Sequence, residues 1–443
     1  MTQEYPKDMN LQAFVDFTDS IKKSFQSSKD SEVAKSDFRR LIENNDTLKT
    51  LTRMLYSLPY MHNLTINSGT RRPEGFRESN RENEISEDAY VYDIIELMEL
   101  MHSGEVDEID RYLLVKRYMK ANFENMNHFY KLIKKEGYGG IPLDFVEECI
   151  GGVERIAYRP KMDLCSDVLE KVDLAGYYMI PNPGKENGKA VRLWLTFNAY
   201  GELNFIGEND RMCYSCWSVL NDIAYSFKDN RIRNMVIEGT MYVPDENGNE
   251  DQNSKPMFFW PHHCVSGPLK FSMYDMYTID EFFNGKCDRP YLQRYEALKD
   301  KMSEAVDPRG NWCVPEISAV ESNESLLRHL ATGSYDCDGY LLMSPNPIDH
   351  DKIQEYSVTK NVASVHIDSA ETRNGTLYAK LSGYDGEYGT LLDLTEPASK
   401  SYIEARPSFL INKDVDVVYL KKYTIKEKNK RKVVLDTPIL QKN

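Results

Sequence analysis

The residues that come nearest to a metal-ligand pattern are two cysteines and a later His-His-Cys string. Cys213 and Cys216 have C-x-x-C spacing, and His262, His263 and Cys264 begin 46 residues after Cys216. A structural zinc site usually combines one C-x-x-C with a second spaced pair. The adjacent His-His-Cys lacks that spacing, and MFFWPHH is also typical of an apolar strand followed by a turn. We therefore expect the eight scattered cysteines to be free thiols.

Cations that could contact phosphate are concentrated in two places, although the whole chain has a net charge of −15. Residues 412–443 contain nine Lys/Arg against four Asp/Glu, and a polar stretch at 65–88 contains several arginines. Because bulk attraction to a polyanion is excluded, any nucleic-acid contact must use such local patches. The predicted contact residues are Arg71, Arg72, Lys421, Lys422, Lys430, Arg431 and Lys432.

Apolar residues recur at helical spacing from residue 10 to about 136, as in Ile94, Met98 and Met101. After Pro142 the pattern changes to short β-rich runs, such as VRLWLTF and LKFSMYDMYT, with helical stretches between them. This pattern predicts an α+β domain built on antiparallel sheets. From about residue 361 five short strand-like runs follow, a number that suits a small OB-like barrel.

A chain of 443 residues with 41% hydrophobic residues is long enough for two to four globular domains. We predict a helical domain at 1–145, an α+β domain at 146–358 and a β-barrel at 359–443. The N-terminal MTQEYPKDMN lacks the features of a signal peptide, and no apolar stretch approaches membrane-spanning length. We expect a cytoplasmic monomer that does not bind a membrane.

Three parts of the chain resemble phage-type ATP-dependent DNA ligases. Residues 269–302 resemble the family's strand, Asp, loop and arginine-rich helix start, and residues 45–68 resemble its N-terminal helical repeat. The strings NGTLYAKLSGYDGEYGTLLDL and VDVVYLKKYTIKEKNKRKVVLDTPIL resemble its OB-fold, which clamps nicked duplex. The resemblance implies a helical DNA-binding domain, a nucleotidyltransferase domain of antiparallel sheets and a C-terminal OB-fold.

The resemblance implies that a lysine takes AMP from ATP, passes it to the 5′-phosphate of a nick, and that a 3′-hydroxyl then displaces AMP. The family's nucleophile lies in K-x-D-G, and this chain has Lys185, Asn187 and Gly188 in KENG. IPNPGKENGKAV is also an ordinary hairpin loop, so Lys185 is either the nucleophile or a solvated loop lysine. Lys161, in KMDL, is a rival candidate that lacks the glycine.

The other positions that the resemblance assigns are also altered. Glu238 in VIEGTMYV and Asp338 in DGYLLM are the implied metal ligands, and Met343 replaces the lysine of the family's E-G-x-x-x-K. Lys360 remains as the cation of its K-x-K element. Glu238 shares a strand face with Thr240 and could point into a pocket or into solvent.

Arg192, Phe271 and Tyr274 complete the implied nucleotide site. Strand alternation places Phe271 and Tyr274 on opposite faces, so at most one stacks on adenine while the other packs in the core. Arg192 contacts a phosphate or lies on a solvated strand face.

Two functions follow from this pattern. The first is an ATP-dependent DNA ligase that uses Mg²⁺ and acts on nicked double-stranded DNA in replication, repair or recombination. The second is a degenerate ligase-fold protein that binds nicked or duplex DNA without forming a lysyl adenylate, which the substitutions at Asn187, Thr240 and Met343 would favour.

Overall fold

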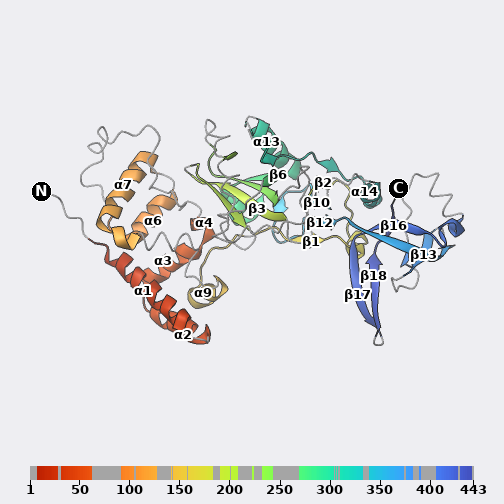
Figure 1. Cartoon of the computed structure of the whole chain (residues 1–443). Helices are drawn as coiled ribbons and strands as arrows, with labels where there is room; N and C mark the ends of the chain where they lie inside the picture. The colour runs from red at the N-terminus through yellow and green to blue at the C-terminus, as the bar shows by residue number, and fades with distance from the viewer. Residues whose placement is uncertain are drawn as a thin grey trace.

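In the computed structural model the N-terminal helices lie at one end of the molecule, the C-terminal strands lie at the other end, and the central sheets lie between them (Figure 1). It describes residues 7–27, 31–61, 91–103, 106–126, 141, 143–156, 158–182, 190–199, 201–207, 222–223, 232–242, 269–303, 305, 307, 310–332, 339–373, 376–382, 389–390, 406–427 and 430–441.

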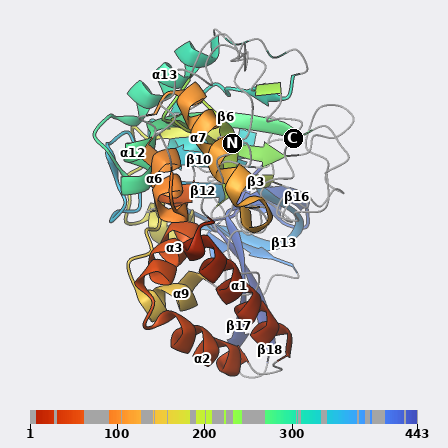
Figure 2. The same ribbon diagram turned by 90° about the vertical axis from the view of Figure 1, so that its left-hand side faces the viewer.

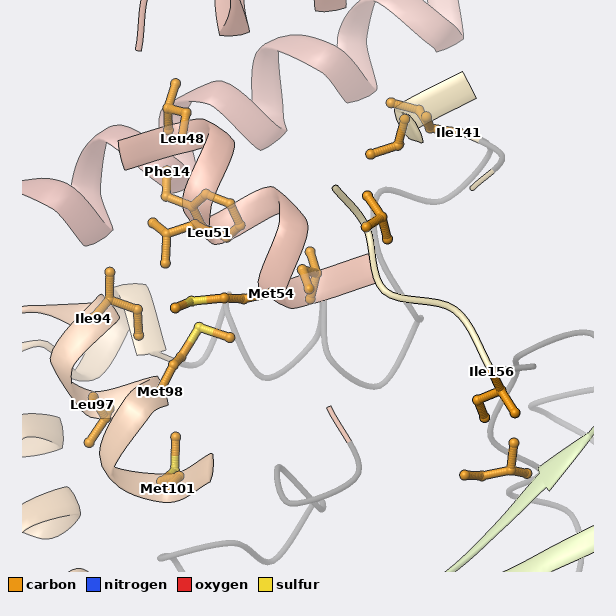
Figure 3. Packing of buried hydrophobic residues seen from close by; sticks show 14 of the residues in the cluster. Phe14, Leu48, Leu51, Met54, Ile94, Leu97, Met98, Met101, Ile141 and Ile156 are labelled. Carbon is orange, nitrogen blue, oxygen red and sulfur yellow. The ribbon is translucent and has the colours of Figure 1, made fainter. Parts of the chain in front are cut away.

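The described N-terminal part is mainly helical, as the periodicity predicted. A single apolar cluster joins these helices through residues such as Phe14, Leu51, Met98 and Met101 (Figure 3). The helices are α1 (Met9–Ser27), α2 (Ser31–Ile42), α3 (Asp46–Tyr56), α4 (Leu58–Met61), α6 (Ile94–Ser103), α7 (Glu108–Ala121) and α9 (Leu143–Ile150).

The central part contains two five-stranded sheets, both mainly antiparallel. The first sheet has the order β1 (Lys161–Asp163), β12 (Glu355–Thr359), β10 (Gly339–Met343), β2 (Tyr178–Pro181), β9 (Ser318–Ala319). The second sheet has the order β4 (Leu203–Gly207), β3 (Ala190–Phe197), β5 (Met235–Tyr242), β6 (Lys270–Thr278), β8 (Trp312–Cys313). The same region contains α10 (Ser166–Leu169), α12 (Ile279–Asn284), β7 (Lys286–Cys287), α13 (Tyr291–Ser303), α14 (Asn323–Thr332) and β11 (Ile348–Asp349).

The second sheet is buried on both faces. Leu193 and Ile237 of one face share a cluster with Leu298 of α13. Trp194 and Val236 of the other face belong to the same apolar cluster as the N-terminal helices. This double burial explains why β3 and β5 are apolar almost throughout instead of alternating with exposed polar residues. Figure 2 shows α6 and α7 in front of strands of the central sheets, among them β3 and β6.

The C-terminal part is β-rich, but its described strands do not close into the predicted barrel. They form an open sheet with the order β15 (Gly389–Thr390), β14 (Thr376–Leu381), β13 (Asn361–Arg373), β16 (Asp414–Tyr419), β19 (Ile439–Leu440), next to a 3₁₀ turn at Pro407–Leu410. A separate two-stranded element, which we call the basic hairpin, consists of β17 (Lys421–Glu427) and β18 (Lys430–Asp436). The predicted strand VDVVYLKKY is divided at the buried Leu420, where the chain leaves the open sheet for the hairpin.

Asp8 connects the start of the helical part to two distant helices. Its carboxylate accepts hydrogen bonds from the backbone N–H of Ile94, at 2.7 Å, and from the hydroxyl of Tyr118, at 2.5 Å. Its own N–H donates to the side-chain oxygen of Asn122 at 2.9 Å. Because Asp8 is only 4% exposed, water cannot replace these contacts.

We predict that Asp8→Ala lowers the free energy of unfolding by about 2–4 kcal/mol, because two buried donors lose their acceptor. Tyr118→Phe removes one donor and leaves the carboxylate bonded to backbone, so we expect a loss of only about 1 kcal/mol. Urea denaturation of both variants measures the difference. An Asp8→Ala protein as stable as Tyr118→Phe would contradict this role.

Candidate functional site

A cluster of buried charges lies where the two central sheets meet. On the second sheet, Arg192 and Trp194 of β3 share a face with Glu238 of β5, since Trp194 and Glu238 are directly paired across the strands. The cluster is completed by Asp275 of β6 and by Glu355 of β12, both 0% exposed. It therefore combines residues from both sheets.

A β-bulge next to Glu238 sets the local geometry. The register between β5 and β6 shifts after Glu238, which pairs with Asp275, while Gly239 pairs with Met273. A Cβ atom at Gly239 would lie 2.5 Å from the carbonyl oxygen of Ser272, so only glycine fits this close approach. Tyr274 is the extra residue of the bulge, and both it and Asp275 lie on the charged side.

Both oxygens of Glu238 are engaged. Oε2 accepts from Arg159 at 2.6 Å and from the hydroxyl of Tyr277 at 2.6 Å. Oε1 accepts from Nε of Arg192 at 2.7 Å and receives a longer hydrogen bond of 3.4 Å from Tyr274. Glu238 is thus held from two strands and from the segment that precedes β1.

Asp275 lies directly opposite Glu238, and two like charges in that position would repel each other. Arg159 bridges them, since it also donates to Asp275 Oδ2 at 3.2 Å. Arg294 of α13 forms a bidentate pair with Asp275, at 2.8 and 3.0 Å. The hydroxyl of Tyr277 lies 2.5 Å from Asp275 Oδ2, so its single proton is shared between the two carboxylates.

The aromatic rings support the guanidinium groups. The guanidinium of Arg192 lies 4.9 Å from the ring centroid of Trp194, and that of Arg159 lies 5.6 Å from the ring centroid of Tyr277. Such cation–π contacts stabilise a cation that has lost its water.

The arginines decide the charge state of Glu238. Burial alone would raise the pKa of its carboxyl, but the charges of Arg159 and Arg192 lower that pKa to about 2. Burial also raises the pKa values of Tyr274 and Tyr277 well above their usual value, so both hydroxyls keep their protons. The cluster therefore holds an ionised Glu238 beside neutral tyrosines.

A small cavity of about 20 Å³ borders this cluster. Its volume is close to that required by one water molecule. It is lined by Tyr158, Arg159, Arg192, Trp194, Glu238, Tyr277, Glu281, Phe282, Gly285 and Ile348.

The predicted nucleophile and its neighbours, Lys185, Asn187 and Gly188, lie outside the described residues. The ends of their loop are described. Asn182, at the end of β2, donates its N–H to the carbonyl of Gly339 on β10 and accepts from the hydroxyl of Thr240 on β5. The loop therefore starts between the two sheets, and it ends at the first residue of β3.

Arg192 and Glu238, which were predicted separately, are brought together at 2.7 Å. Phe271 is fully buried in the apolar cluster below the second sheet, whereas Tyr274 belongs to a different cluster and bonds to Glu238. The opposite faces expected for these two aromatics are observed.

Lys360 connects β12 to β13 and takes no part in the ion pairs described for this cluster. Burial lowers the pKa of His329, and the charge of Lys360 lowers it further. Asp338, the second predicted metal ligand, lies outside the described residues, and the described strand begins at Gly339. Lys161, the rival nucleophile, lies on β1 in register with Glu355.

The predicted DNA contacts are only partly described. Arg71 and Arg72 lie outside the described residues. Lys421 and Lys422 are exposed on β17, and the backbone of Lys430, Arg431 and Lys432 forms β18.

The described site does not offer Mg²⁺ a coordination position at Glu238, because guanidinium and hydroxyl groups already engage both of its oxygens. Its role as a metal ligand stays a prediction. The considered zinc ligands Cys213, Cys216, His262, His263 and Cys264 lie outside the described residues. Within the described ranges, Asp349, His350 and Asp351 are close enough to share a cation, but Asp349 is already paired with Lys352 at 2.9 Å.

Sequence reasoning missed Arg159, Arg294, Asp275 and Glu355 as members of this cluster. One signal in the sequence could have indicated them. Glu238 and Asp275 each lie within an apolar strand-like run, and two buried acids require buried cations nearby.

No protein-family model and no curated protein matches the chain. Solved structures do match. The structure titled "Pmar-Lig_PreS3" is 12% identical with a TM-score of 0.39, over 96% of this chain and 98% of that chain. The ATP-dependent DNA ligase of bacteriophage T7 in complex with ATP is 15% identical with a TM-score of 0.35, over 62% and 97%. The Chlorella virus DNA ligase-adenylate is 12% identical with a TM-score of 0.34, over 65% and 98%.

The latter two titles name DNA ligases. That is the family which the sequence strings resemble. All three TM-scores are below 0.5, so the superpositions alone establish nothing about the activity of this chain.

Within the described ranges, none of the helices combines the length and the apolar character needed to cross a membrane.

We predict that Glu238→Gln lowers the free energy of unfolding at pH 7 by about 3–5 kcal/mol, because two buried guanidiniums lose their shared carboxylate. The exposed Glu316, which pairs with Lys299 at 2.8 Å, is the control; Glu316→Gln should cost less than about 1 kcal/mol.

The same variant tests the pH dependence. The pKa of Glu238 in the folded protein, about 2, lies below its usual 4.5. Its stabilising contribution is therefore present above pH 4.5 and is lost as the pH falls toward 2. Acid titration of folding should show that Glu238→Gln loses less stability than the wild type over this interval. If the two proteins lost the same stability over this interval, the pairing of ionised Glu238 with Arg159 and Arg192 would be excluded.

Proposed function

We propose that this chain is an ATP-dependent polynucleotide ligase in which Lys185 forms a lysyl-AMP intermediate. The observation that carries the proposal is the position of the described residues on either side of Lys185. Asn182, which precedes it, contacts both sheets. Ala190, which follows it, begins the strand that carries Arg192 into the buried charge cluster.

Adenylyl transfer has two requirements. The attacking amine must be neutral, because a protonated amine has no lone pair with which to attack phosphorus. Cationic groups must hold the phosphates of ATP, and Arg192 and Arg159 both line the cavity beside the cluster.

In the proposed reaction the neutral Nζ of Lys185 attacks the α-phosphorus of ATP. An N–P bond forms, the bond to the bridging oxygen breaks, and pyrophosphate leaves. An oxygen of the 5′-phosphate at a nick then attacks the same phosphorus, the N–P bond breaks and the lysine is released. A 3′-hydroxyl finally attacks the 5′-phosphate, the phosphodiester forms and AMP leaves. The resemblance implies that Mg²⁺ would neutralise the triphosphate in the first of these steps.

The proposed nucleic-acid substrate is nicked double-stranded DNA. The basic hairpin supports this choice, since it projects away from the body of the molecule (Figure 1) and carries Lys421 and Lys422 on its exposed surface. Lysines on a projecting two-stranded ribbon can follow a phosphate backbone without reading its sequence.

Incubation with ATP and Mg²⁺ should add the mass of one AMP to the protein, as measured by intact-mass spectrometry. Lys185→Ala should abolish the adduct and nick sealing, and Lys185→Arg should not restore them because a guanidinium does not deprotonate. Lys161→Ala is the matched control and should keep the adduct. Absence of an adduct in the wild type between about pH 6 and 9 would exclude the enzyme and leave a DNA-binding protein without adenylylation.

Replacing Lys421 and Lys422 by alanine should weaken binding to nicked duplex and reduce the slope of log affinity against log salt by about 1–2, since each lost phosphate contact contributes about 1. Replacing Lys299 and Lys301 of α13, which lies on the other side of the molecule in Figure 1, should leave the slope unchanged. Fluorescence anisotropy over a salt series measures both. Equal slopes for the wild type and the Lys421/Lys422 variant would show that the hairpin does not contact DNA.

A further inference from the structure

Two carboxylates share the guanidinium of Arg192, and they are held unequally. Glu238 is bound through both oxygens by two arginines and two tyrosine hydroxyls. Glu355 is bound through Oε2 alone, at 2.8 Å from Arg192 and 3.7 Å from Arg159. Glu355 is thus the more weakly held of the two anions.

The second oxygen of Glu355 has no hydrogen-bond partner among the described residues, although the side chain is 0% exposed. A buried carboxylate oxygen without a donor is unfavourable, because it has lost water and gained nothing in exchange. Exchange of Glu355 for another anion therefore costs less than exchange of Glu238.

Arg159 and Arg192 line the cavity together with Glu238 and Glu281, whereas Glu355 does not. An anion that entered there would meet Arg159 and Arg192 directly. A phosphate group offers several acceptor oxygens to the forked donors of arginine, whereas Glu355 supplies only one. The present cavity of about 20 Å³ is too small for a phosphate, so the exchange requires a side chain to move.

We propose that Glu355 is an internal competitor that occupies an anion site formed by Arg192 and Arg159, and that a phosphate of the bound nucleotide displaces it. This inference rests on the proposed function for the identity of the nucleotide, but the anion site itself does not depend on the chemistry of Lys185. A cation at the unpartnered oxygen is disfavoured, since two guanidiniums lie near the other oxygen of the same carboxylate.

The test is the affinity of inorganic pyrophosphate for the full chain, measured by calorimetry. Glu355→Gln keeps the shape of the side chain and removes its charge, so pyrophosphate should bind about fivefold or more tightly, the lower end of typical coupling between competing sites. Glu355→Asp withdraws the carboxylate from Arg192 but keeps its charge, so it should give a smaller gain in pyrophosphate affinity. This variant provides the test if Glu355→Gln does not fold.

Glu316→Gln is the control. Glu316 is exposed, pairs with Lys299 at 2.8 Å and does not line the cavity. Its replacement changes the net charge by the same amount without releasing the anion site, so the affinity should change much less. Equal gains for the two glutamine variants would reduce the effect to general charge and overturn the proposal. Unchanged or weaker pyrophosphate binding in folded Glu355→Gln or Glu355→Asp would overturn it as well.

Measurement in the Lys185→Ala background separates this inference from the proposed function. A gain in pyrophosphate affinity without any AMP adduct in the wild type would leave the anion site in place and exclude the ligase. An AMP adduct in the wild type without a gain in pyrophosphate affinity would support the ligase and exclude the anion site.

Discussion

The burial of Glu238 between Arg159 and Arg192 is the constraint on which the centre of the molecule depends. An ionised carboxylate at 1% exposure is tolerated only when cations and donors replace its water. This need accounts for the surrounding features. The bulge at Gly239 brings Tyr274 and Asp275 to the same side, Asp275 then requires Arg294, and Arg192 extends the network to Glu355 on the other sheet.

The network also joins parts of the chain that are far apart in sequence. Arg159, in the segment between the N-terminal helices and the first sheet, bonds to Glu238, which lies 79 residues later. Trp194 and Val236 extend the apolar cluster of the helices onto the second sheet. The boundary predicted at residue 145 therefore falls next to a continuous core.

Much of the local structure was predictable from the sequence, because it depends on short-range periodicity. Most of the helices up to Ala121 and the α13 helix follow from the 3.6-residue spacing of apolar residues. The strands that contain Arg192 and Glu238 follow from short runs rich in apolar residues. The start of α2 at Ser31 does not, because its first residues are polar. The partners of Glu238 did not follow, because strand pairing and the approach of Arg159 are long-range events. The bulge at Tyr274 and the break at Leu420 were also not predictable, since neither interrupts the apolar pattern. Lys185 illustrates a third case, in which the motif gave a candidate whose own position the structure does not describe.

The contact between Arg192 and Trp194 has an optical consequence. Trp194 is one of four tryptophans in the chain, and it is 2% exposed. An indole in such dry surroundings emits at shorter wavelength than one in water, and a guanidinium 4.9 Å from its ring perturbs the excited state. Any movement of Arg192 therefore changes the light that Trp194 emits. The intrinsic fluorescence of Trp194 therefore reports on the charges that a ligand would rearrange, without an added label.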